Sequence, residues 1–144
     1  MDFSESNNNL LYASYNEEED CVIFGTKNGF YVYTLYPQKK IISQKIMGGV
    51  SKICMLHRSN MVFFVGTLEK GLYNTKNVHI WDDSQKKNVG HITFNKNVKH
   101  IQVYTNYIVI STEDTIYIYN FDNLQLLRSI QTNNNKNGLF KVSI

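Results

Sequence analysis

Residues 76–83 read "KNVHIWDD", a short run of β-branched and aromatic side chains that ends in two aspartates. The apolar residues recur with the period of a β-strand, and the aspartates favour a strand-ending turn over a catalytic or metal-binding pair. Comparable runs are "FYVYTLY", residues 30–36, and "TIYIYNF", residues 115–121. Nowhere does an apolar stripe keep helical spacing through about ten residues, so the sequence predicts an all-β protein without a long helix.

Residues that favour tight turns join these runs. In "CVIFGTKNGFYVYTLY", residues 21–36, two apolar runs meet at Lys27-Asn28-Gly29. Asn-Gly between such runs is a strong hairpin signal because both residues tolerate positive φ. Further turns are predicted at residues 57–60, 105–106 and 113–114. The runs are therefore expected to pair as antiparallel hairpins.

The hairpins repeat along the chain. Tyr33, Trp81 and Tyr119 fall on one another when the three runs are aligned, at intervals of 48 and 38 residues. These intervals bracket the roughly 40–45 residues of a WD-type propeller blade, and a polar loop at residues 67–76 accounts for the longer one. Strands of the second unit are predicted at residues 50–56, 61–66, 77–83 and 88–94.

The sequence therefore predicts a WD40-like β-propeller fragment of about three four-stranded blades. Its expected parts are a polar N-terminal tail at 1–9, blade 1 at 10–47, blade 2 at 48–95, blade 3 at 96–131 and the start of blade 4 at 138–144. A propeller closes with four to eight blades, so we expect a fragment of a longer protein. Two copies are expected to self-associate through the end sheets, because uncovered apolar faces seek a cover in water.

The side chains that could bind a metal or take part in catalysis are expected to have structural roles instead. Cys21 and Cys54 each lie in an apolar run without a second cysteine at metal-ligand spacing, which predicts reduced, buried side chains. His57 and Arg58 are expected to be solvated side chains of a plain turn. Trp81 and the abundant tyrosines are interpreted as packing between blades. We expect neither an enzyme nor a cofactor.

Charge is distributed unevenly along the chain. Residues 1–20 carry six acidic and no basic side chains, and the fifteen lysines and arginines that follow are scattered singly or in pairs. This pattern favours a solvated polar face over attraction to an anionic membrane surface or to nucleic acid, and no nucleic-acid partner is expected. The acidic start is unlike a signal peptide, and no apolar run approaches the roughly 18 residues that cross a bilayer. A soluble, cytoplasmic protein is expected.

Several segments together resemble the PROPPIN family, and most of all its branch related to the human WIPI proteins three and four. They are "YNEEEDCVIFGTKNGFYVY", "GGVSKICMLHRSNMVFFVG", "KNVHIWDD", the set "VKHIQV", "IVI" and "DTIYIYNF", and "NKNGLF". The resemblance begins near Leu11 and implies the first three blades of a seven-bladed propeller. It also implies an autophagy adaptor that is recruited to membranes carrying phosphatidylinositol 3-phosphate or 3,5-bisphosphate.

The family's lipid site depends on a Phe/Leu-Arg-Arg-Gly motif in the fifth and sixth blades. Two arginines there each hold a phosphorylated inositol headgroup, for which the planar guanidinium is suited. This sequence has no Arg-Arg pair, and Arg58 and Arg128 are its only arginines. The resemblance therefore implies that residues 1–144 do not bind these lipids by themselves. The alternative is a scaffold propeller that binds proteins without lipid selectivity.

The resemblance also implies contacts between loops of the first three blades and a large lipid-transfer protein of autophagy. The first matching segment contains Asn16, Glu17 and Glu18, where Glu18 replaces a usual Asp. The second is the end of the long loop, where Thr75 and Lys76 replace the Pro-Arg of some members. The candidate partner-binding residues are Asn16, Glu18, Leu72, Tyr73, Asn74, Thr75 and Lys76.

Overall fold

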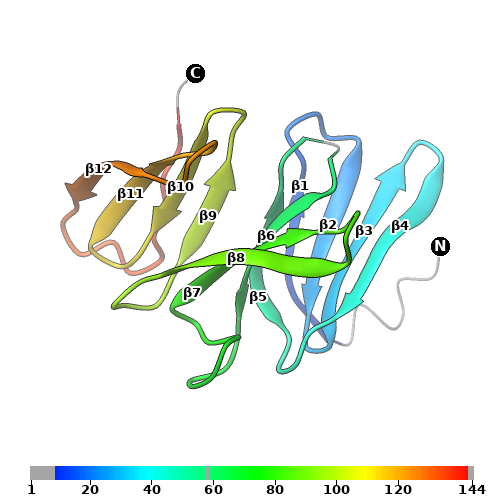
Figure 1. The fold of residues 1–144 in the computed structure, drawn as a ribbon, viewed down its shortest axis with the longest axis horizontal. Coiled ribbons are helices and arrows are strands. Elements are labelled where there is room, and N and C mark those ends of the chain that lie inside the picture. The colour runs from blue at the N-terminus through cyan, green and yellow to red at the C-terminus, as the bar shows by residue number, and fades with distance from the viewer. Residues whose placement is uncertain (1–8, 58, 143–144) are drawn as a thin grey trace.

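Twelve strands make up the fold in the computed structural model, which describes residues 9–57 and 59–142 (Figure 1). They form three four-stranded antiparallel sheets with the orders β1-β2-β3-β4, β5-β6-β7-β8 and β9-β10-β11-β12. The strands are β1 Leu10–Tyr15, β2 Cys21–Thr26, β3 Gly29–Leu35, β4 Gln38–Lys45, β5 Val50–Met55, β6 Met61–Gly66, β7 Asn77–Asp82, β8 Lys87–Thr93, β9 His100–Val103, β10 Tyr107–Ser111, β11 Thr115–Asn120 and β12 Leu126–Gln131. The predicted all-β architecture of three blades is confirmed.

The same irregularity recurs in each blade and confirms the repeat. Pairing of the third strand with the fourth shifts register immediately before Tyr33 in blade 1, before Trp81 in blade 2 and before Tyr119 in blade 3. A β-bulge bends its strand and increases the local twist. The three aligned aromatic residues therefore occupy one structural position. In blade 2 the observed strand ends differ from the predicted ones by at most one residue.

The sheets pack face to face, with their first strands innermost. Strand β5 contacts β1 and β2 on one side and β9 on the other. Side chains of β6 alternate between the two resulting cores: Phe64 packs toward blade 1 and Phe63 toward blade 3. This alternation is the period of two expected of a strand that is covered on both faces. Both cysteines are buried thiols outside any disulfide, as predicted.

Gly29 supplies the backbone conformation that the first hairpin needs. Its φ is +152°, and a Cβ at this position would overlap the carbonyl oxygen of Gln44 in the neighbouring strand. The Thr26 hydroxyl completes the turn by accepting the backbone N–H groups of Asn28 and Gly29, each at 3.2 Å. Only a glycine combines this dihedral angle with so close a neighbour.

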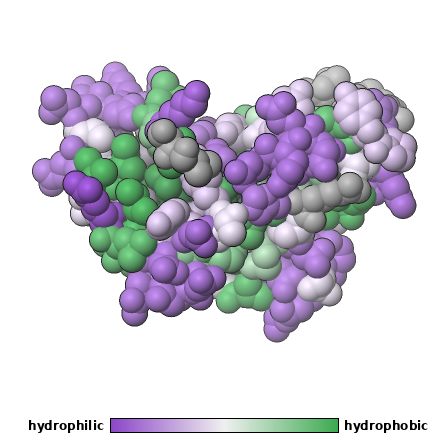
Figure 2. Space-filling view, turned by 90° about the horizontal axis from the view of Figure 1, so that it is seen from above, coloured by the Kyte–Doolittle hydropathy of each residue, from purple (hydrophilic) through white to green (hydrophobic). Residues whose placement is uncertain are grey.

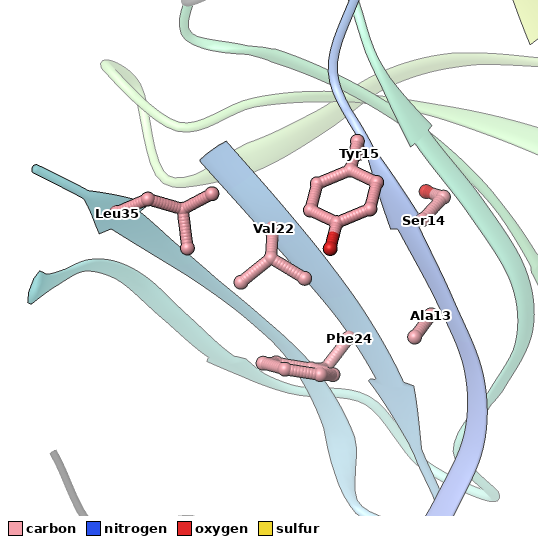
Figure 3. A pocket seen from close by; sticks show the side chains of 6 residues that line it. All are labelled: Ala13, Ser14, Tyr15, Val22, Phe24 and Leu35. Carbon is pink, nitrogen blue, oxygen red and sulfur yellow. The ribbon is translucent and has the colours of Figure 1, made fainter. Parts of the chain in front are cut away.

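Both end sheets carry apolar side chains that the described residues leave partly or largely uncovered. On blade 1, Ala13, Ser14, Tyr15, Val22, Phe24 and Leu35 line a cavity of about 390 Å³ (Figure 3). On blade 3, Leu126, Leu127 and Ile130 of β12 are exposed, and Figure 2 shows apolar surface among polar side chains on the left, where this blade lies. Self-association through these faces stays a prediction.

The expected start of a fourth blade lies beside blade 3 as irregular chain. The Ser111 hydroxyl donates to the carbonyl of Gly138, and the ring of Phe140 packs against His100 with centroids 4.8 Å apart. Residues 1–8 of the predicted tail, Arg58 and residues 143–144 lie outside the described residues. Over the described part of the chain, no helix is long and apolar enough to cross a membrane.

Candidate functional site

The two candidate partner-binding segments lie at opposite ends of the blades. Residues 16–20 form the β1–β2 turn, at the same end as the β5–β6 and β9–β10 turns (Figure 1). Residues 67–76, here called the long loop, connect β6 to β7 at the other end. The fold therefore gives two separate surfaces, and the structure does not bring the two segments together.

Asn16 organises the β1–β2 turn from a buried position. Its side chain is 3% exposed, and its Oδ1 accepts the backbone N–H groups of Asp20 at 3.1 Å and Cys21 at 2.9 Å. Its Nδ2 donates to Asp20 Oδ1 at 2.6 Å and to the carbonyl of His57 at 3.2 Å. Asn16 thus shapes the turn and ties blade 1 to blade 2, while Glu18 remains 45% exposed.

Replacing Asn16 with alanine is expected to lower the free energy of unfolding by about 1–3 kcal/mol, the usual cost when a buried hydrogen bond is removed. The buried bond that is lost joins the backbone N–H of Cys21 to Asn16 Oδ1. Asn123→Ala is the matched control, since the exposed Asn123 makes a comparable bond to the Gln125 N–H that water can replace. Urea denaturation measures both variants, and equal losses of stability would contradict the assigned role of Asn16.

His57 connects all three blades at the same end. Its Nδ1 contacts Glu18 Oε1 and lies 3.2 Å from Glu17 Oε2, both in blade 1. Its Nε2 lies 2.7 Å from Thr105 Oγ1 in the β9–β10 turn of blade 3. The expectation of a merely solvated side chain is wrong for His57, because the β5–β6 turn lies between the β1–β2 and β9–β10 turns and the ring contacts both. Arg58 lies outside the described residues.

Glu17, Glu18 and His57 also hold three potential metal ligands close together. Their ligand atoms lie within 4.8 Å of one another. Both glutamates are substantially exposed, at 39% and 45%, and the group is already held together by the contact between His57 and Glu18. The arrangement is accounted for as a side-chain contact that joins two blades.

The long loop is an ordered turn at the opposite end. The backbone N–H of Leu68 donates to the Tyr73 carbonyl at 3.2 Å, and the N–H of Thr75 donates back to the Leu68 carbonyl at 3.0 Å. Asn74 braces the loop from within, donating to the carbonyl of Gly71 and accepting the N–H of Lys76, both at 2.8 Å. A loop held in shape by internal bonds loses less conformational entropy when it binds a partner.

Blade 2 anchors this loop through Tyr73 and the carbonyl of Leu72. The Tyr73 ring stacks on Phe64 with centroids 6.1 Å apart, and the Leu72 carbonyl accepts bonds from Asn77 at 2.9 Å and His79 at 2.8 Å. The Leu72 side chain itself is 51% exposed. The loop therefore holds an apolar side chain out toward solvent on a fixed backbone.

A polar hollow of about 270 Å³ lies beside the loop. Its lining is Lys76, Asn95, Lys96, Asn97, Lys99 and Glu113. Thr75 joins the loop to this lining by donating to Asn97 Oδ1 at 2.6 Å. Lys96 donates a hydrogen bond to the Asp114 carboxylate, and this bond raises the pKa of Lys96 and lowers the pKa of Asp114. Sequence reasoning missed the hollow, because its lysines are scattered along the chain and meet only in the fold.

Curated relatives match nearly the whole chain. SVP1-like protein 2 of Kluyveromyces lactis is 34% identical over 116 residues, which are 81% of this chain and 32% of the relative. Autophagy-related protein 18e of Arabidopsis thaliana is 32% identical over 141 residues, which are 96% and 38%. The chain thus spans about a third of the length of these relatives. No family model matches it.

Solved propellers match the fold. The structure of Kluyveromyces lactis Hsv2 aligns with a TM-score of 0.75 and 30% identity, over 85% of this chain and 37% of that one. A complex of an Atg21 protein with the coiled coil of Atg16 aligns with a TM-score of 0.73 at 19% identity, over 85% and 39%, which supports the fold alone. These relatives, the repeated bulge and the blade order agree, and the chain belongs to the PROPPIN family of β-propellers.

Proposed function

We propose that residues 1–144 form the protein-docking portion of an autophagy-related propeller adaptor that is cytoplasmic and binds membranes peripherally. The observation that carries this proposal is the long loop, which holds Leu72 exposed on a backbone fixed by Asn77 and His79. A preorganised apolar side chain beside a polar rim is the anatomy of a protein-binding hot spot. One curated relative is named autophagy-related protein 18e, and a solved Atg21 binds a coiled coil of Atg16.

The partner that we propose is the lipid-transfer protein of autophagy, docked on the long loop with its acidic side chains over the neighbouring lysines. Lys76 and Lys99 line the hollow beside the loop, and complementary charge at an interface rim favours association. The β1–β2 turn is the second candidate surface. Its acidic Glu17 and Glu18 are exposed at the opposite end of the blades, so variants at the two ends separate the two surfaces.

Replacing Leu72 with aspartate is expected to weaken partner binding about 10- to 100-fold, because a charge replaces a central apolar contact worth about 1–3 kcal/mol. Leu127→Asp is the matched control, since Leu127 on β12 is 53% exposed and Leu72 is 51% exposed. Calorimetry with the purified lipid-transfer protein measures both. Equal affinities of the wild type and Leu72→Asp, or loss on Glu18→Lys alone, would remove the long loop as the docking surface.

Phosphoinositide recognition is proposed for a propeller in which further blades follow residues 1–144. The two arginines of this chain are Arg58 and Arg128, and Arg128 lies on β12, whose residues are all exposed. Neither stands in an arginine pair that grips a headgroup from two sides. The lipid-unselective scaffold is the competing function, and membrane binding by the longer propeller separates the two.

A further inference from the structure

His79 is a fully buried histidine on β7 that contacts the long loop. Its exposed fraction is 0%. The imidazole stacks on Phe64 of β6 with ring centroids 5.2 Å apart and packs against Tyr73 of the loop at 5.0 Å. His91 of β8 lies on another side, at 5.7 Å. The ring is therefore enclosed by blade 2 and by the loop that this blade carries.

The hydrogen bonds of His79 define its charge and tautomer. The carbonyl of Leu72 can only accept, so Nε2 must carry a proton to make its 2.8 Å bond. On the other side Asn88 Nδ2 lies 2.7 Å from Nδ1, and the Asn88 amide is oriented by its Oδ1, which accepts the N–H of Gly90 at 3.1 Å. Its NH₂ group thus faces Nδ1, which must accept. A proton on Nδ1 would set two donors against each other, so the ring is held neutral.

The surroundings favour the same neutral form. Burial lowers the pKa of His79, the bond to the Leu72 carbonyl opposes this shift, and the nearby His91 adds to it. The titratable groups around the ring in the described residues are His91 on β8 and Tyr73 on the loop, while β6 contributes the apolar Phe64. When the loop opens, the ring is exposed and its pKa returns to the ordinary histidine value of about 6.5. Because the pKa is lower in the closed form, the closed form is fully stable above about pH 6.5 and loses stability as the pH falls below it.

We propose that His79 is a positioning residue that latches the long loop onto blade 2, and that its protonation releases the loop. The latch acts on the backbone carbonyl of Leu72, the residue whose side chain is proposed to dock the partner. It regulates docking only if the long loop is the docking surface, so this part rests on the proposed function. Acidification then weakens docking through a change in the loop, without a change in any side chain that contacts the partner.

Hydrogen exchange of the full chain tests the latch without a partner. The backbone N–H groups of Leu68 and Thr75 are bonded inside the loop and report its opening. Between about pH 7.5 and about pH 5.5, on either side of the ordinary histidine pKa, their protection is expected to fall about tenfold after correction for the chemical exchange rate. Unchanged protection in the wild type would overturn the proposal.

Two variants and one spectrum complete the test. His79→Gln keeps a donor for Leu72 and does not titrate, so its protection is expected to be independent of pH, whereas His91→Gln is expected to behave like the wild type. Equal pH dependence in His79→Gln and wild type would overturn the proposal. Nitrogen NMR of the wild-type ring is expected to show the neutral Nε2–H tautomer near neutral pH, and an Nδ1–H or charged ring would equally overturn it. If the long loop is not the docking surface, these exchange and NMR results are unaffected, and calorimetry shows equal affinities of wild type and Leu72→Asp.

Discussion

Replacing Phe64 with alanine is expected to lower the free energy of unfolding by about 3–5 kcal/mol, the usual loss when a buried phenylalanine leaves a cavity. Phe64 is 0% exposed in β6. It contacts Phe30 of blade 1 at 5.4 Å between ring centroids, and it also stacks on Tyr73 and His79. One side chain therefore supports the contact between two blades and the base of the long loop.

Urea denaturation measures this loss, and Leu127→Ala is the control. Leu127 is 53% exposed on β12, so its truncation is expected to change stability by no more than about 0.5 kcal/mol. The long loop should also lose hydrogen-exchange protection in Phe64→Ala, because Tyr73 no longer has a ring to stack on. A loss of stability no larger than that of the control would show that blades 1 and 2 do not share the core described above.

The repeat was predictable from the sequence because it depends on local pattern. Strand alternation and turn residues placed Tyr33, Trp81 and Tyr119 in register, and the structure puts each one directly after a bulge. Alternation is a property of neighbouring residues, so a single sequence contains it. Gly29 was predictable for the same reason, since a turn between two paired strands needs its conformation.

The contacts of the histidines were not predictable, because their partners lie far away in the sequence. His57 meets Glu18 across 39 residues and Thr105 across 48. No spacing rule relates turns of three different blades, so the solvated turn was the reasonable expectation from sequence. His79 stands in a strand where it resembles any polar residue of an alternating run, and only the fold shows that the long loop covers it.

For the candidate partner-binding residues, the sequence indicated which residues to consider but not how the fold arranges them. The family resemblance gave Leu72 and Lys76 as candidate partner-binding residues, and both are exposed in the fold. It did not indicate that Asn16 is buried and bonded on all sides, or that the β1–β2 turn and the long loop are at opposite ends. Whether either surface binds a partner stays a prediction that the calorimetry tests.

Membrane binding selective for 3-phosphorylated inositol lipids is expected of a complete propeller and is not expected of residues 1–144 alone. A chain that continues residues 1–144 to a complete seven-bladed propeller is expected to prefer 3-phosphorylated inositol lipids by at least about 100-fold, because charge-assisted bonds to the added phosphate are worth about 1.5–3 kcal/mol each. Residues 1–144 alone offer scattered lysines, whose attraction to a membrane is screened by salt and indifferent to headgroup structure.

Liposome flotation at physiological salt is the measurement that tests the central claim most directly. Vesicles contain either phosphatidylinositol 3-phosphate or the same amount of phosphatidylinositol, and each is mixed with the complete propeller or with residues 1–144. We predict that the complete propeller floats only with the 3-phosphorylated lipid and that residues 1–144 float with neither. Selective flotation of residues 1–144 would contradict the assignment of the lipid site to later blades, and equal flotation of the complete propeller with both lipids would establish the unselective scaffold instead.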